Sequence, residues 1–276
     1  MPSLAGRDGV SLVRADASMK TALVTGACSG IGLAFAEQLA ALGYELVLVS
    51  NRKAELEQVA ARLAATVKTH AIVMDLARTA AAQELVAAVD QLGLEIDILV
   101  NNAGVFFFGE VSDAEPAKIA AMLELHVVTP SLLGRHLGRR MRDRRRGHLL
   151  FVSSISAWND FPGIALYGAS KKYLKSFALA LRSELRPWGV NVTIVAPGAT
   201  ATGLYDPKVV DVGKATRLRI MTGPGPVARA ALQAMFAGRA LVVPGLASKL
   251  FAWGMALAPR WLIHLVRLRV PWLRRP

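Results

Sequence analysis

A strand, a glycine-rich turn and a helix follow one another directly in residues 20–43 (KTALVTGACSGIGLAFAEQLAALG). The apolar run Ala22–Val24 predicts a short strand, and apolar residues at helical spacing predict the helix. Between them, Gly26 permits a sharp turn at backbone angles closed to other residues, Gly30 lets the main chain approach a ligand, and Gly32 lets the helix pack tightly on the strand. The N–H groups at the helix start would then face an anion, most simply a pyrophosphate.

The spacing of this turn is G-x-x-x-G-x-G, which differs from the common dinucleotide pattern G-x-G-x-x-G. A tight turn that binds no ligand is therefore the alternative interpretation of the three glycines. The one cysteine of the chain, Cys28, lies inside the turn. Because no base is evident beside it, we interpret Cys28 as a small filler and not as a nucleophile.

Apolar strand-like runs alternate with helical patterns along most of the chain. The runs are nearly continuous in apolar residues, as expected of parallel strands covered on both faces. Alternation of this kind predicts an α/β fold, a single doubly wound Rossmann-type domain with a parallel seven-stranded sheet and helices on both faces. The predicted strands are 22–24, 45–49, 71–74, 96–100, 148–152, 190–195 and 240–243, and the predicted helices are 54–65, 79–92, 116–141, 167–186 and 226–237.

Three parts of the chain are expected. Residues 1–18 form a polar N-terminal tail without the apolar segment of a signal peptide. Residues 19–243 form a dinucleotide-binding catalytic domain, and residues 244–276 form an amphipathic C-terminal extension. A single cysteine excludes an intrachain disulfide framework and suits a reducing compartment, so a cytoplasmic location is predicted.

Tyr167 and Lys171 form the pattern Y-x-x-x-K at the start of a predicted helix, so that both side chains share one face. A lysine ammonium there can lower the tyrosine pKa from about 10 toward the working pH. Such a tyrosine can pass a proton to or from a carbonyl or alcohol oxygen. Ser154, at the end of a predicted strand, can donate a hydrogen bond to the same oxygen.

These motifs resemble the short-chain dehydrogenase/reductase family over about residues 20–245. The resemblance is carried by TGxxxGIG at 25–32, NNAG at 101–104, the serine of FVSS, YxASK at 167–171, and PG followed by threonine at 197–202. It implies NAD(P) binding and hydride transfer between nicotinamide and a carbonyl or secondary alcohol. It also implies that Asn101 braces the cofactor side. The cofactor-binding residues predicted in this way are Gly26, Ser29, Gly30, Ile31, Gly32, Asn51, Arg52, Asp75, Leu76, Asn102, Ala103, Gly104, Tyr167, Lys171, Pro197, Gly198, Thr200 and Thr202.

The residues after the second predicted strand indicate which cofactor is used. An NAD-preferring site would place an acidic residue here to hold the ribose 2′-hydroxyl group. The sequence instead has Asn51 and Arg52, followed by Lys53. A guanidinium group can pair with the 2′-phosphate of NADP, so NADP is favoured over NAD. A solvated helix start is the alternative interpretation of these cations.

His126 is a departure from the family pattern. The family commonly has an asparagine at this point, which holds a water in a proton relay behind the lysine; here the local sequence is Leu125-His126-Val127. A histidine can also accept and donate, but its charge changes near neutral pH. We therefore consider His126 both as a catalytic residue of a modified relay and as a buried packing residue.

The positive charge of the chain is concentrated at its C-terminal end. Residues 1–211 carry 22 Lys+Arg and 20 Asp+Glu, whereas residues 212–276 carry 11 Lys+Arg and no acid. Residues 244–276 also contain Trp253, Trp261 and Trp272, and their apolar runs are shorter than the ~20 residues needed to span a bilayer. This segment fits a membrane surface or packing within the chain or an oligomer, and it fits nucleic acid least. The arginine run at 135–146 has a solvated helix end as its simpler interpretation.

The sequence thus predicts an NADP-dependent oxidoreductase that acts on a carbonyl or secondary alcohol, with a lipophilic substrate. Its predicted catalytic residues are Ser154, Tyr167, Lys171 and His126, and no metal site is expected. A homodimer or homotetramer is expected, with peripheral membrane attachment through 244–276 as an option. The alternative is an NADP-binding sensor or scaffold with little turnover, which His126 suggests.

Overall fold

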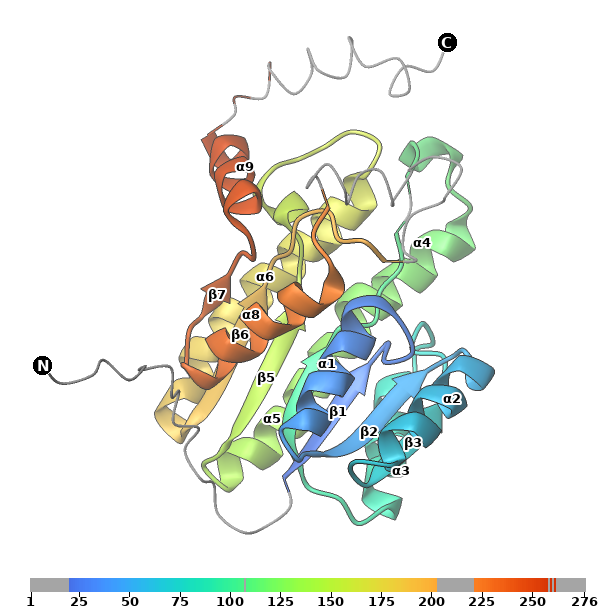
Figure 1. Ribbon diagram of the computed structural model, residues 1–276. Helices are drawn as coiled ribbons and strands as arrows, with labels where there is room; N and C mark the ends of the chain where they lie inside the picture. Colours follow the sequence, from blue (N-terminus) through green and yellow to red (C-terminus); the bar gives the residue numbers. More distant parts are fainter. Residues whose placement is uncertain (1–19, 107, 203–220, 258, 260, 262–276) are drawn as a thin grey trace, which may run out of the picture.

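The computed structural model describes residues 20–106, 108–202, 221–257, 259 and 261. In this part of the chain a seven-stranded parallel sheet has the order β3-β2-β1-β4-β5-β6-β7 (Figure 1). The chain starts in the middle with β1, runs outward to β3, and returns to β4 on the other side of β1. This confirms the predicted doubly wound fold. The strands are β1 (Thr21–Thr25), β2 (Glu45–Ser50), β3 (Thr69–Val73), β4 (Ile96–Asn101), β5 (Gly147–Val152), β6 (Val190–Val195) and β7 (Leu241–Val242).

Helices cover both faces of the sheet, because successive strand side chains point to opposite faces. Ala22 and Val24 of β1 pack into one core, and Leu23 between them packs into the other. The first core is closed by α1 (Gly30–Ala41), α2 (Lys53–Ala64) and α8 (Pro224–Phe236). The second core is closed by α3 (Ala81–Gln91), α5 (Thr129–Asp143) and α6 (Ala165–Leu185).

The prediction of one continuous helix over 116–141 is wrong, because the structure has two helices there. Helix α4 (Pro116–Leu123) and helix α5 are separated by one wide π-helical turn at Glu124–Val128. Pro130 has no N–H group and therefore cannot bond the carbonyl of His126 four residues back. Wide turns of this type are frequent at functional sites. The interruption places His126 at the widened turn, with its side chain buried.

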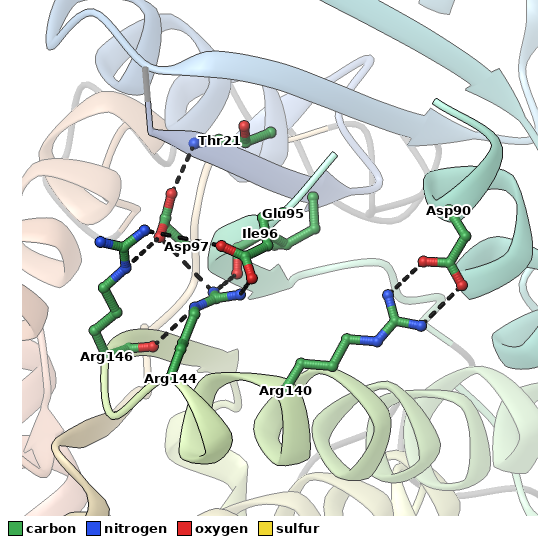
Figure 2. Close-up of polar contacts among 8 residues, drawn as sticks. All are labelled: Thr21, Asp90, Glu95, Ile96, Asp97, Arg140, Arg144 and Arg146. Carbon is green, nitrogen blue, oxygen red and sulfur yellow. Dashed lines mark hydrogen bonds and ion pairs between the residues drawn. The ribbon is translucent and has the colours of Figure 1, made fainter. Parts of the chain in front are cut away.

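The arginine run at 135–146 is held by acidic side chains at the amino-terminal edge of the sheet (Figure 2). Arg140 forms a bidentate ion pair with Asp90. Arg144 lies 3.2 Å from a carboxylate oxygen of Glu95, and Arg146 lies 3.8 Å from one of Asp97. Much of this positive charge is thus paired within the described residues, at the opposite end of the strands from the glycine turn.

The C-terminal extension begins with helix α9 (Leu246–Leu257), which follows β7 directly. The domain boundary between residues 243 and 244 stays a prediction. The tail at 1–18 and most of the extension beyond α9 lie outside the described residues.

Candidate active site

The site lies where the strand order reverses, between the carboxyl ends of β1 and β4, which is where α/β sheets bind ligands. Thr25, the last residue of β1, ties the two strands together. Its hydroxyl oxygen accepts hydrogen bonds from the backbone N–H groups of Asn102 (2.9 Å) and Ala103 (3.0 Å). The side-chain amide of Asn102 in turn donates to the Thr25 backbone carbonyl at 2.9 Å. The NNAG segment is therefore fixed against the glycine turn.

The three glycines of the turn have the conformations and contacts that their spacing predicts. Gly26 has a φ of 67° and Gly30 a φ of 55°, both in the left-handed region that favours glycine. A Cβ atom on Gly32 would lie 2.1 Å from the Gly26 carbonyl oxygen, so only glycine fits there. Helix α1 has no acidic residue in its first turn, which leaves its positive dipole end uncompensated. A dinucleotide pyrophosphate fits this cradle.

Arg52, at the end of β2, lies against the outside of the same turn. Its guanidinium donates to the Cys28 sulfur from Nε at 3.2 Å and from Nη2 at 2.9 Å. Nη2 also donates to the Ser29 hydroxyl oxygen at 2.5 Å. The cation is thus held beside the start of α1, with Glu55 at 3.6 Å as its acidic neighbour. This arrangement suits a second anionic group next to the pyrophosphate position.

Tyr167 and Lys171 lie one turn apart in α6, and the Lys171 ammonium is 5.7 Å from the centroid of the Tyr167 ring. Lys171 is buried and donates to the Val152 carbonyl at 3.0 Å. Burial lowers the pKa of Lys171 to about 8. Below that pH the ammonium form predominates, and its charge favours ionisation of the neighbouring phenol.

Ser154 lies two residues after the end of β5, which pairs with β4. Its hydroxyl oxygen accepts the Ser156 N–H at 3.1 Å, where it caps a short helical turn. The hydroxyl proton can then be donated to a ligand in the pocket, which Ser154 lines together with Tyr167.

His126 lies behind these residues and uses both ring nitrogens. Nε2 accepts the Val105 N–H at 3.0 Å, so in the neutral ring the proton is on Nδ1. Nδ1 lies 2.9 Å from the Ser170 oxygen, and the Ser170 hydroxyl donates onward to the Tyr167 carbonyl at 2.8 Å. Burial and the nearby Lys171 charge hold the His126 pKa well below its usual value.

One pocket of about 750 Å³ brings nearly all of the predicted site residues together. Gly32 does not line it, because it packs against Gly26 beneath the turn. His126 does not line it either, and lies with Asn101 and Lys171 around a much smaller cavity. The predicted residues on the pocket wall are Gly26, Ser29, Gly30, Ile31, Asn51, Arg52, Asp75, Leu76, Asn102, Ala103, Gly104, Ser154, Tyr167, Lys171, Pro197, Gly198, Thr200 and Thr202.

The sequence prediction missed the apolar part of the pocket, which is lined by Phe106, Phe161, Ile164 and Phe251. Phe106 packs edge-on against the Tyr167 ring, with the ring centroids 5.0 Å apart. The four residues come from three separate segments, and no spacing rule connects those segments. The sequence offered only the aromatic run after NNAG as a signal for Phe106.

Comparison with known proteins gives a consistent result. A model of the short chain dehydrogenase family matches residues 20–211. An uncharacterised oxidoreductase of Bacillus subtilis is 36% identical over 191 residues, which cover 68% of this chain and 77% of that protein.

Two solved structures show the same fold over nearly the whole chain. A short-chain dehydrogenase from Sphingobium yanoikuyae in complex with NADPH has a TM-score of 0.75 and 28% identity, and covers 94% of this chain and 98% of its own. A 7beta-hydroxysteroid dehydrogenase has a TM-score of 0.79 and 26% identity, and covers 89% and 96%.

Proposed function

Because the chain belongs to the short-chain dehydrogenase/reductase family and is an NAD(P)-dependent oxidoreductase, we propose that it uses NADP and acts on a lipophilic carbonyl compound or secondary alcohol. One observation carries the proposal. Tyr167, Lys171 and Ser154 converge on a pocket that has a phosphate cradle in one part and apolar walls in another.

The choice of NADP is supported by Arg52 and by the residues around it. The residues directly after β2 are Asn51, Arg52 and Lys53, none of them acidic, and the Arg52 guanidinium is oriented by Cys28 and Ser29 beside the phosphate cradle. A similar protein, from Sphingobium yanoikuyae, binds NADPH. When bound, the cofactor supplies or accepts a hydride at the substrate carbon. Pro197, Gly198 and Thr202 would border its nicotinamide end, as the family resemblance implies.

The residues of the chain handle the proton and the substrate oxygen. Tyr167 donates a proton to the carbonyl oxygen in reduction, or removes one from the alcohol in oxidation. Lys171 keeps a positive charge near the phenol, which stabilises the phenolate left after donation. Ser154 donates a hydrogen bond to the same oxygen and so stabilises the charge that develops there.

The apolar pocket walls support a lipophilic substrate. Phe106, Phe161, Ile164 and Phe251 line the pocket, and the Phe106 ring lies against the Tyr167 ring. Burial of apolar substrate area against such walls is favourable by roughly 25 cal/mol per Å². A similar protein is a hydroxysteroid dehydrogenase, whose name indicates a large apolar substrate.

We propose that His126 positions the catalytic turn and does not carry a proton. Both ring nitrogens are engaged, one with the Val105 N–H and one with Ser170, and the lowered pKa keeps the ring neutral near pH 7. A neutral ring can accept from Val105, whereas a protonated ring would direct a second N–H at it. His126 thereby joins the loop after β4 to the turn of α6 that bears Tyr167.

His126→Asn is expected to flatten the fall in stability below pH 6.5. The unfolded chain binds a proton near that pH and the folded chain does so only at lower pH, so the His126 contribution is present above pH 6.5 and is lost as the pH falls. Below pH 6.5, the free energy of unfolding of the variant should therefore fall less steeply with pH than that of the unaltered protein. The difference in slope should be up to ~1.4 kcal/mol per pH unit. Because the bridge to Ser170 is broken, turnover should also drop by about tenfold.

Urea unfolding at a series of pH values, with kcat measured alongside, checks this expectation. His148 is the matched control, because it is half-buried and also has a lowered pKa but lies near the amino-terminal end of β5. His148→Asn should change the pH slope and leave kcat unaltered. A proton-carrying His126 would instead impose its own pKa on kcat, which would contradict the positioning role.

NADPH consumption with a panel of aldehydes and ketones tests the proposed function. We expect turnover to rise with the apolar area of the substrate, and NADPH to be preferred to NADH by about tenfold or more. Tight NADPH binding without turnover of any substrate would favour the sensor or scaffold alternative. Assembly into a homodimer or homotetramer and a cytoplasmic location stay predictions.

A further inference from the structure

Helix α9 contacts the body of the protein through one narrow face. Ala252 is fully buried. Ser248 packs closely on Gly198: a Cβ atom added to Gly198 would lie 2.4 Å from the Ser248 hydroxyl oxygen. Phe251 reaches the pocket and forms part of its apolar wall. The helix therefore lies at the mouth of the active site, beyond the carboxyl end of β7 (Figure 1).

The opposite face of α9 is apolar and exposed. Leu246, Leu250, Trp253 and Leu257 are 73%, 67%, 75% and 83% exposed, and Trp261 beyond the helix is 67% exposed. The four helix positions follow the spacing i, i+4, i+7 and i+11, so they form one stripe. We call these five residues the α9 ridge. Within the described residues, the large apolar side chains that are more than half exposed are these five and Phe251.

We propose that the α9 ridge binds the surface of an anionic lipid bilayer and opens the active-site pocket toward it. Tryptophan and leucine on one face of a helix are typical of the membrane interface. Residues 244–276, which include the ridge, carry six Lys+Arg and no acid, so this segment of the sequence attracts anionic headgroups. None of the helices in the described ranges has the length and hydropathy of a membrane span.

A second copy of the chain is the other occupant to consider. A two-fold contact places the same surface of each copy against the other. It would bring two segments that carry only positive charge close together, and like charges repel. An anionic bilayer has the opposite sign and covers the same apolar side chains, so the charge pattern favours lipid.

The position of the ridge has a consequence for substrate access, which rests on the proposed function. The residues that line the pocket include Val105, which is 44% exposed, and Phe251 of α9, which is 52% exposed. An apolar carbonyl compound dissolved in the bilayer could pass along the ridge to Phe251 without crossing bulk water. The bilayer would then both bind the ridge and supply the substrate.

Flotation of the full-length protein with vesicles tests the proposal. The vesicles contain equal parts of phosphatidylcholine and phosphatidylserine, and matched vesicles contain phosphatidylcholine alone. The double variant Trp253→Glu/Leu257→Glu puts two charges on the ridge without touching the pocket residues. Trp188→Glu is the matched control, because Trp188 is 44% exposed but lies just before β6, at the amino-terminal edge of the sheet.

We expect the unaltered protein and the Trp188 variant to float with the anionic vesicles, and added salt to weaken binding. The ridge variant should bind at least ~tenfold more weakly, since it loses apolar burial and gains repulsion from the lipid. All three should bind NADPH equally. The ridge variant should also retain its turnover of a water-soluble aldehyde, while losing turnover of a ketone supplied within vesicles.

Three results would overturn the proposal. The first is no flotation of the unaltered protein at low salt, and the second is equal flotation of the unaltered protein and the ridge variant. The third is that no protein floats and the ridge variant differs from the unaltered protein in its molar mass in solution. The last result would assign the ridge to a second copy. Failure of the proposed function is separate, because absent turnover of every substrate leaves the vesicle binding intact.

Discussion

Replacement of Tyr167 by phenylalanine is expected to lower kcat by ~10²-fold or more while NADPH binding stays nearly unchanged. The variant keeps the ring, and therefore keeps the edge-on contact with Phe106 and the proximity to Lys171. Only the proton donor is removed. Because the substrate oxygen then develops charge without receiving a proton, the loss belongs to the chemical step and should appear in kcat more than in KM.

Steady-state kinetics and NADPH titration by fluorescence measure the two effects. Tyr173→Phe is the matched control, since Tyr173 lies on the same helix, is 41% exposed and has its hydroxyl 3.0 Å from Ser131. The control should retain full activity. Full reductase activity in the Tyr167 variant would refute the assignment of the proton donor.

The charge reversal Arg52→Asp is expected to shift cofactor preference from NADPH toward NADH by about tenfold or more, which corresponds to about 1.4 kcal/mol. The aspartate would repel a 2′-phosphate and could accept a hydrogen bond from a ribose hydroxyl. The ratio of kcat/KM for the two cofactors is the relevant measurement, because it cancels any general loss of activity.

Lys53→Asp provides the control for this experiment. Lys53 is the neighbouring cation, but it lies 3.9 Å from Glu57 and is not among the residues that line the pocket. The Lys53→Asp variant should leave the ratio of kcat/KM for the two cofactors nearly unchanged, because solvent and salt screen the effect of an exposed charge. If the ratio is the same in both variants and in the unaltered protein, Arg52 does not recognise the 2′-phosphate.

The interrupted helix shows where prediction from the sequence was incomplete. The apolar pattern over 116–141 is helical throughout and predicts one continuous helix, whereas the structure has helices α4 and α5 on either side of a π-helical turn. The π-helical turn at 124–128 follows from a missing backbone N–H at Pro130 and from the contacts of His126 with two other segments. Those contacts involve residues far away in sequence, which periodicity does not report.

The sequence by itself determined the fold class, the glycine turn and the pairing of Tyr167 with Lys171. Each of these depends on local spacing: strand–turn–helix order, backbone angles that only glycine adopts readily, and one helical turn between two side chains. Tertiary structure alone decided the orientation of Arg52, the bridging contacts of His126 and the apolar walls of the pocket. The exposure of the α9 ridge was likewise decided by which face of the helix packs on the body. These features join side chains from distant segments, whose distances are fixed only when the sheet and its helices have packed together.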